Sequence, residues 1–232
     1  MDRYVFDVDG TITPSRQKIL PEMEKLFLEL ISKHKVYLVT GSDYDKTLEQ
    51  VGKEIIESVE KVYNCSGSDV WKNGKNIERS DWVLPYEVKL WLDDKFSSSE
   101  YPVRTGTHFE NRPGLCNFSI IGRNATLEQR KDYVKYDKET NERDTIVKEF
   151  NNVFCNVTSS AGGETGIDIH PIGKDKSQIM SDFVDKDTIH FFGDRMDKEG
   201  NDYSLSLKAD KNYHVKTWKD TFNIVRVLLR SS

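Results

Sequence analysis

Short apolar runs and helical apolar patterns alternate in the first third of the chain. Residues 4–6 form a short β-prone run, and residues 36–39 form a continuous apolar run bounded by turn-type residues, which is typical of a buried parallel strand. Between these runs, the apolar residues that recur at helical spacing are Met23, Leu26, Phe27, Leu30 and Ile31. A second helix is marked by Leu48, Val51, Ile55 and Val59, and a further short strand by residues 62–63. This β-α-β-α-β alternation predicts a parallel sheet covered by helices.

The middle of the chain follows a different pattern. Asn73-Gly74 is the signal of a two-residue hairpin turn, and Arg112-Pro113-Gly114 joins two β-prone stretches that we interpret as an antiparallel hairpin. The elements expected here are a helix near 86–96, β-prone stretches at 103–110 and 115–121, a polar helical segment at 126–150 and a strand at 153–158. Helices that follow antiparallel strands indicate an inserted α+β domain.

The first pattern returns from about residue 167. The elements expected there are strands at 167–170, 188–192 and 213–216, and helices at 175–184, after Asn201 and around Phe222, Val225 and Leu228. The sequence therefore predicts an α/β protein with a Rossmann-like parallel-sheet core that is split in sequence. We place the core domain in residues 1–81 and 166–232, and the inserted α+β domain in residues 82–165.

Composition and charge narrow the class of protein. The 232 residues are 36% hydrophobic and 31% charged, which supports a folded protein with a sizeable core. A formal net charge of −5 gives no electrostatic reason to expect nucleic acid as a partner. No apolar run approaches the ~20 residues of a membrane span, and the first residues do not resemble a secretion signal, so we expect a cytoplasmic protein. Three widely spaced cysteines indicate neither a disulfide framework nor a CxxC metal site.

Three clusters of polar residues fall at the ends of predicted strands, where ligands of open parallel sheets bind. They contain Asp7 with Asp9, Thr40 with Ser42, and Asp194. Asp7 and Asp9 point to the same side because side chains alternate along a strand. An isolated aspartate before glycine usually caps a turn, but three aspartates at strand ends are poorly explained in that way. Their mutual repulsion would be relieved by a hard cation such as Mg²⁺.

These residues resemble the haloacid dehalogenase superfamily of phosphotransferases. The motifs that carry the resemblance are Asp7-Val8-Asp9-Gly10-Thr11, Thr40, Lys176, Gly193-Asp194 and Asn201-Asp202. The resemblance implies the haloacid dehalogenase fold, in which the inserted domain is a cap. It also implies that Asp7 attacks phosphorus to form an aspartyl-phosphate, and that Asp9 is the general acid and base.

The same resemblance implies a metal and a phosphate site in the core. Mg²⁺ would be held by the Asp7 side chain, the Asp9 backbone carbonyl and Asp194, with Asp202 supporting the metal. The transferring phosphoryl group would be bound at Thr40, Ser42 and Gly10. Lys176 would offset the charge of both the phosphate and Asp7.

A closer resemblance, which includes the inserted domain, is to the eukaryotic-type phosphomannomutases. The resembling segments are residues 6–13, Arg16-Gln17-Lys18-Ile19, Gly41-Ser42-Asp43, Gly106-Thr107, Asn117, Ile121-Gly122-Arg123, Glu128-Gln129-Arg130, Gly162-Gly163, Asp168, residues 191–194 and Gly200-Asn201-Asp202. In this family the cap holds the non-reacting phosphate of the substrate with arginines. The positions that match the family's substrate-binding residues are Arg16, Arg112, Arg123, Arg130 and Asp168. Arginine suits this task because its planar fork matches phosphate oxygens.

The resemblance implies a phosphomannomutase that interconverts mannose 6-phosphate and mannose 1-phosphate, and also glucose phosphates, with a hexose 1,6-bisphosphate as activator. It further implies a homodimer joined through the caps and a place in mannose metabolism that leads to GDP-mannose. A Mg²⁺-dependent sugar-phosphate phosphatase is the alternative, and Thr40 favours it because the mutases usually have glycine there. Gly166 also departs from the family, which has a ligand-binding serine at that position. A sugar-phosphate-binding protein without turnover is a third hypothesis, but the set of Asp7, Asp9, Lys176 and Asp194 is intact.

Overall fold

The computed structural model describes residues 1–198 and 200–231, and these divide into two compact units. The core unit contains residues 1–80 together with the described residues from 173 onward, and the inserted unit contains residues 81–172. Within the described part of the chain, no helix is both long enough and apolar enough to cross a membrane.

A seven-stranded sheet forms the centre of the core unit. Its strands are β1 (Asp2–Phe6), β2 (Lys35–Val39), β3 (Lys61–Asn64), β4 (Asp69–Lys72), β5 (Lys75–Arg79), β10 (Thr188–Gly193) and β11 (Lys211–His214). They lie in the order β11-β10-β1-β2-β3-β4-β5. The first five strands in this order pair in parallel, whereas β4 and β5 form an antiparallel hairpin at one edge. The hairpin turns at Asn73 and Gly74, which both have positive φ, as the Asn-Gly signal predicts.

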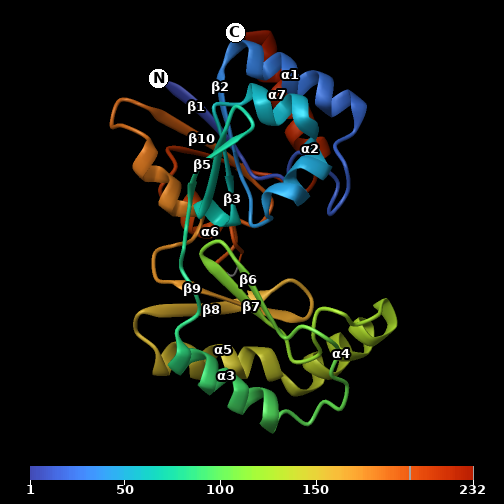
Figure 1. The fold of residues 1–232 in the computed structure, drawn as a ribbon. Helices are drawn as coiled ribbons and strands as arrows, with labels where there is room; N and C mark the ends of the chain where they lie inside the picture. The colour runs from blue at the N-terminus through green and yellow to red at the C-terminus, as the bar shows by residue number, and fades with distance from the viewer. Residues whose placement is uncertain (199, 232) are drawn as a thin grey trace. The chain divides into compact units, whose positions relative to one another are not determined.

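Helices cover both faces of this sheet. They are α1 (Pro21–Lys33), α2 (Tyr44–Ser58), the 3₁₀ helices η1 (Cys65–Gly67) and η2 (Lys176–Asp182), α6 (Tyr203–Ser206) and α7 (Trp218–Ser231). On one face, Phe6 stacks on Phe192 at 4.4 Å between ring centroids in a core shared with α1, α2 and α7, which Figure 1 shows together. On the other face, Val5 and Phe191 pack with Ile179 of η2 and Leu205 of α6. Successive residues of β1 and β10 thus pack into the cores on opposite faces of the sheet, because side chains alternate along a strand.

The order of the strands determines where a ligand site forms. After β1 the chain moves to β2 and β3 on one side, and it later returns to β10 and β11 on the other side. Such a reversal of strand order opens a crevice at the carboxyl ends of the central strands. In this protein Asp7, Thr40 and Asp194 directly follow β1, β2 and β10.

The inserted unit contains a four-stranded antiparallel sheet with three helices. Its elements are α3 (Tyr86–Ser98), β6 (Phe109–Arg112), β7 (Leu115–Phe118), α4 (Leu127–Thr140), α5 (Glu142–Val153), β8 (Val157–Gly162) and β9 (Gly166–Pro171). The strands lie in the order β6-β7-β9-β8, and Figure 1 shows α3 and α5 on one side of them. The buried side chains Phe118, Ile167 and Ile169 pack in one core with residues of all three helices. The residues that alternate with them along the strands form a polar face.

The predicted position of the second domain boundary differs from the structure. Residues 167–170 do form a strand, but β9 pairs antiparallel with β7 and β8, so its assignment to the parallel sheet is wrong. Ile167 and Ile169 complete the apolar face of the inserted sheet, and the boundary accordingly falls after residue 172, not after 165. The first boundary, after residue 80, lies one residue from the predicted position.

Several predicted elements also differ in length or type. The strand expected at 153–158 begins only at Val157, because α5 continues to Val153, and the helix expected at 175–184 is the 3₁₀ helix η2. The strand expected at 103–110 forms only at Phe109–Arg112. The polar helical segment at 126–150 is two helices, separated at Asn141, which adopts the left-handed conformation that ends a helix.

The revised boundary predicts which fragment folds alone. A fragment of residues 81–172 should unfold cooperatively in urea, because it contains its whole sheet and apolar core. A fragment of residues 82–165 should be largely disordered, because it lacks β9 and leaves β7 and β8 without their shared neighbour. Far-UV circular dichroism during urea titration measures both, and cooperative unfolding of the shorter fragment would contradict the assignment of β9.

Candidate active site

The segment after β1 forms a tight loop around one carbonyl group. The backbone N–H groups of Thr11, Ile12 and Thr13 donate to the carbonyl of Val8 at 3.3, 3.0 and 3.1 Å. Gly10 has a φ of +87°, and a Cβ atom there would lie 2.5 Å from Oδ2 of Asp194. Any other residue would therefore both strain the loop and displace the Asp194 carboxylate. The Asp-x-Asp-Gly motif thus brings the end of β1 against the residue that follows β10.

A cluster of three carboxylates lies at these strand ends. Asp7, Asp194 and Asp202 each offer an oxygen atom within 4.8 Å of the others. Asp7 is 4% exposed and Asp202 is fully buried. Lys176, also fully buried, places its Nζ atom 2.6 Å from Oδ1 of Asp7 and 2.6 Å from Oδ1 of Asp202. The other oxygen of Asp202 accepts the backbone N–H of Arg195 at 3.1 Å.

Burial dominates the electrostatics of this cluster. Loss of solvent raises the pKa of Asp7 to about 7, although the neighbouring ammonium group of Lys176 opposes the change. Burial and the charge of Asp202 likewise raise the pKa of Asp194. For Lys176, burial favours the neutral form, but the charges of Asp202 and Asp7 outweigh it and raise its pKa. When all three carboxylates are ionised, one ammonium group leaves the cluster with an excess of negative charge.

The cluster has the properties of a site for a divalent cation. Oδ2 of Asp7 is buried and, among the described residues, has no hydrogen-bond partner. A buried carboxylate oxygen without a partner is costly, and a hard cation would satisfy it. Asp194 is the third carboxylate and is partly exposed, which leaves an approach to the cluster. Asp7, Asp194 and Asp202 therefore fit the Mg²⁺ that the sequence motifs imply.

Asp9 is held apart from this cluster by its own set of hydrogen bonds. Its Oδ1 atom accepts from Nε2 of Gln50 at 3.0 Å and from the backbone N–H of Arg16. Gln50 is 2% exposed and reaches the loop from α2, where its Oε1 atom has no hydrogen-bond partner among the described residues. Sequence reasoning did not identify Gln50, because one glutamine in a helix gives no signal beyond its place beside the apolar stripe that contains Val51.

Thr40 and Ser42 lie in a loop that is fixed to the next strand end. The hydroxyl of Thr40 accepts a hydrogen bond from the backbone N–H of Ser42 at 3.1 Å. The backbone carbonyl of Thr40 accepts one from the N–H of Ser66 at 2.8 Å. The carbonyl of Ser42 accepts the N–H of Cys65 at 2.8 Å. These bonds tie the loop after β2 to the loop after β3, so both predicted phosphate-binding hydroxyls lie on a braced backbone.

The inserted unit carries the remaining predicted residues, most of them on the polar face of its sheet. Glu110 of β6 lies opposite Asn117 of β7, which lies opposite Asp168 of β9. Both Arg112 and Arg123 form ion pairs with Glu110, at 2.9 and 2.5 Å. The structure thus brings two of the predicted arginines and Asp168 onto one face.

Two further positions of the inserted unit concern the ligand-binding residues that the resemblance implies. Arg130 forms a separate pair with Glu164 at 3.6 Å, so it is not part of the cluster around Glu110. At Gly166, where the family has a serine, a Cβ atom would lie 2.4 Å from Nδ2 of Asn117. The side chain of Asn117 therefore occupies the space that a serine side chain would need.

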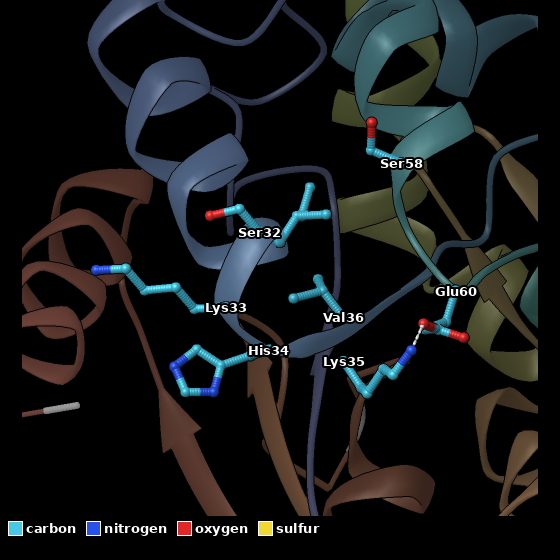
Figure 2. A pocket seen from close by; sticks show the side chains of 8 residues that line it. Ser32, Lys33, His34, Lys35, Val36, Ser58 and Glu60 are labelled. Atoms are coloured by element: carbon cyan, nitrogen blue, oxygen red, sulfur yellow. Dashed lines mark hydrogen bonds and ion pairs between the residues drawn. The ribbon is translucent and has the colours of Figure 1, made fainter.

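A surface cavity in the core unit lies away from these residues (Figure 2). It is lined by residues 31–36, Ser58 and Glu60, and Lys35 forms an ion pair with Glu60 across it. These residues surround the beginning of β2, whereas Thr40 and Ser42 follow its carboxyl end. The cavity therefore lies at the amino end of β2, whereas the carboxylate cluster lies at the carboxyl ends of the parallel strands.

Comparison with solved structures defines the fold. The chain resembles an IMP-nucleotidase from Plasmodium falciparum, with a TM-score of 0.62 at 12% identity over 99% of this chain and 68% of the other. It also resembles the C-terminal domain of a trehalose-6-phosphate phosphatase from C. albicans, with a TM-score of 0.61 at 14% identity over 99% and 92%. At these identities the likeness concerns the fold, and the predicted haloacid dehalogenase fold is confirmed.

Comparison of sequences defines the family. The model of the eukaryotic phosphomannomutase family matches residues 23–231. The chain is 37% identical over 209 residues to a phosphomannomutase from Spinacia oleracea, covering 87% of this chain and 84% of the relative. It is 34% identical over 236 residues to a phosphomannomutase from Saccharomyces cerevisiae, covering 97% and 92%. The chain belongs to the eukaryotic phosphomannomutase family.

The carboxylate cluster predicts a pH-dependent response to Mg²⁺. Between about pH 4 and pH 7, folded Asp7 retains a proton that the unfolded chain releases, so this group makes the metal-free protein less stable as pH rises. Mg²⁺ binds ionised carboxylates, so it should raise the melting temperature more at about pH 7.5 than at about pH 5. Thermal melts with Mg²⁺ or with a chelator measure both effects.

Two variants are the controls for this measurement. Asp194→Asn should abolish most of the Mg²⁺ effect, whereas Asp197→Asn, at a carboxylate that is 58% exposed, should retain it. Without metal, the stability of Asp7→Asn should decline less than that of the unchanged protein as pH rises. An equal Mg²⁺ effect at both pH values, or one that survives in Asp194→Asn, would contradict the assignment.

Proposed function

We propose that this protein is a cytoplasmic, Mg²⁺-dependent phosphomannomutase that interconverts mannose 6-phosphate and mannose 1-phosphate for the synthesis of GDP-mannose. A hexose 1,6-bisphosphate, formed in each cycle, would be its activator, and glucose phosphates would be further substrates. The observation that carries the proposal is the buried Lys176 between Asp7 and Asp202, in a member of the phosphomannomutase family.

Asp7 is the proposed nucleophile. Lys176 holds Oδ1 of Asp7, and Oδ2 has no partner among the described residues, so one oxygen is anchored while the other can bind a metal ion or react. The carboxylate attacks phosphorus, a bond forms between Asp7 and the phosphoryl group, and the bond from phosphorus to the sugar oxygen breaks. Mg²⁺, when held by Asp7, Asp194 and the Asp9 carbonyl with support from Asp202, neutralises charge so that one anion can attack another.

Asp9 is the proposed general acid and base. In its protonated form it gives a proton to the sugar oxygen that leaves phosphorus, and it later takes a proton from the hydroxyl that attacks the aspartyl-phosphate. Gln50 and the backbone N–H of Arg16 hold one oxygen of Asp9, which fixes the orientation of the carboxyl group. Gln50 is thus a positioning residue for the acid and base.

The proposed site for the transferring phosphoryl group is formed by Thr40, Ser42 and the backbone at Gly10. The Thr40 hydroxyl accepts one hydrogen bond and still carries its own proton, which it can donate to a phosphoryl oxygen. Lys176 lies against Asp7 and offsets the negative charge that accumulates there during transfer. The bonds between the loops after β2 and β3 keep these donors in place without reorganisation.

A mutase must also bind the second phosphate and exclude water while Asp7 is phosphorylated. We assign the second phosphate to Arg112, Arg123 and Arg130 of the inserted unit and a sugar hydroxyl to Asp168, and we propose that Arg16 of the core unit also binds the substrate. Arg112 and Arg123 lie side by side on the polar face of the sheet, and Asp168 is two strands away on the same face. This arrangement supports a substrate that carries a phosphate and several hydroxyls.

We also propose a homodimer formed through the inserted unit. The supporting observation is a group of large apolar side chains at and before the start of α3 that are exposed in the single chain. Val83, Tyr86 and Leu90 are 71%, 72% and 50% exposed, and Tyr86 and Leu90 are one helical turn apart. Burial of such a surface against a second copy of the chain would remove it from water.

A Mg²⁺-dependent sugar-phosphate phosphatase is the second candidate. Thr40 favours it, because superfamily phosphatases commonly have threonine at this position and its hydroxyl lies in the proposed phosphoryl site. The two enzymes would share Asp7 and Asp9 and would differ in whether a sugar hydroxyl or water receives the phosphoryl group. A binding protein without turnover is not supported, since Asp7, Lys176 and Asp202 remain in contact.

Phosphorus NMR distinguishes these functions directly. With Mg²⁺, mannose 1-phosphate and a trace of glucose 1,6-bisphosphate, the mutase should form mannose 6-phosphate with little inorganic phosphate. Asp7→Asn should lower the rate by at least about a thousandfold, because the nucleophile is lost. Asp187→Asn is the matched control: the side chain of this aspartate is 5% exposed and pairs with Arg3 at 3.0 Å, but it lies at the opposite end of β1. Accumulation of inorganic phosphate without mannose 6-phosphate would instead establish the phosphatase.

A further inference from the structure

The carboxylate of Glu110 connects two arginines of the inserted unit. Its Oε1 atom accepts from Nε of Arg112 at 2.9 Å and lies 2.9 Å from Nη2 of the same residue. Its Oε2 atom lies 2.5 Å from Nε of Arg123. We propose that Glu110 is a positioning residue that holds Arg112 and Arg123 together as one binding site for the second phosphate of the substrate. This inference rests on the proposed function, in which these arginines bind that phosphate.

The backbone explains why these side chains meet. Glu110 and Arg112 are two residues apart on β6, so their side chains are on the same face of the sheet. Arg123 follows β7, and its backbone N–H donates to the carbonyl of Thr107 at 2.7 Å, which fixes its position near the start of β6. The two arginines therefore approach Glu110 from different segments, and the carboxylate uses a separate oxygen for each.

The contacts continue from the arginines toward the proposed sugar site. Nη1 of Arg123 lies 3.5 Å from Oδ1 of Asn117, and Nδ2 of Asn117 donates to Oδ1 of Asp168 at 2.6 Å. Glu110 and Asp168 both lie opposite Asn117 in the register of the sheet, one on each side of it. A row of polar side chains thus links Arg112 to Asp168, and Glu110 fixes the end of the row that would bind phosphate.

The negative charge of Glu110 has two opposite effects on phosphate binding, and the geometry shows which one is larger. Two guanidinium groups repel each other, and a carboxylate between them removes that repulsion before any ligand arrives. The same carboxylate also reduces the positive charge that attracts a phosphate. Each arginine has five N–H donors and uses only part of them on Glu110, and the side chains of Arg112 and Arg123 remain 22% and 34% exposed. Both side chains therefore stay accessible to a phosphate while Glu110 holds them, so ordering of the arginines outweighs competition.

The test is the steady-state kinetics of Glu110→Gln with mannose 1-phosphate, Mg²⁺ and a trace of glucose 1,6-bisphosphate as activator. Glutamine keeps the shape of the side chain, but its amide nitrogen cannot accept a hydrogen bond, so one arginine is released. We expect KM to rise about tenfold with a much smaller change in kcat, because the phosphate contact is made equally in the ground state and the transition state. Loss of folded enzyme would lower kcat and leave KM unchanged, so this readout separates positioning from stability.

Glu149→Gln is the matched control. Glu149 is in the inserted unit and pairs with Lys95 at 2.6 Å on a helix surface, so its replacement removes an ion pair without touching the polar face. KM should not change. Glu110→Asp keeps the charge but is one methylene too short to contact both arginines, so it should also raise KM.

Two outcomes would overturn the inference, and they differ from failure of the proposed function. A lower KM in Glu110→Gln would make Glu110 a competitor of phosphate, and an unchanged KM would make it irrelevant to binding. Both results are informative only if Arg112→Ala and Arg123→Ala each raise KM. If neither arginine variant changes KM, the assignment of the second phosphate to these arginines is wrong, and the proposed function fails at that point.

Discussion

A buried lysine between two buried aspartates is the interaction on which the candidate site depends. Lys176 begins η2, Asp7 follows β1 and Asp202 follows β10, so one ammonium group connects three segments that are distant in sequence. Removal of three charges from water costs several kcal/mol per ion, and a hydrophobic replacement is often at least as stable. We therefore attribute the cluster to a role in catalysis or ligand binding rather than to a contribution to folding stability. Among the described residues, this arrangement leaves Oδ2 of Asp7 without a hydrogen-bond partner, which is the feature that a metal ion or a phosphoryl group requires.

The proposed function assigns a different part of the chemistry to each unit. In the core unit, apolar strands place the carboxylate cluster at the carboxyl ends of the parallel strands, where the loop that carries Thr40 and Ser42 also begins. In the inserted unit, the apolar face of the sheet packs on helices while the opposite face carries arginines, Asn117 and Asp168. A reaction that moves a phosphoryl group between two oxygens of one sugar needs both kinds of site. This requirement gives a physical reason for an insertion with its own core.

The sequence was sufficient to predict the sheet and the strand ends, because apolar runs followed by aspartates combine two independent signals. The boundary after 165 was wrong because Ile167 and Ile169 alternate in a manner that suits either sheet, and alternation does not identify the partner strand. Lys176 was predicted only through the family resemblance. Gln50 and Glu110 were not predicted, since their importance lies in contacts across the fold, which no local pattern reveals.

The most direct test is to trap the covalent intermediate. The enzyme would be mixed with Mg²⁺ and glucose 1,6-bisphosphate labelled in its phosphate groups, quenched in acid and digested, and the labelled peptide sequenced by mass spectrometry. The arrangement of Lys176 and Asp7 predicts an acyl phosphate on Asp7 that is stable in acid and is lost with hydroxylamine. Label on another residue, or turnover of the bisphosphate by an active enzyme in which Asp7 is replaced by asparagine, would contradict it.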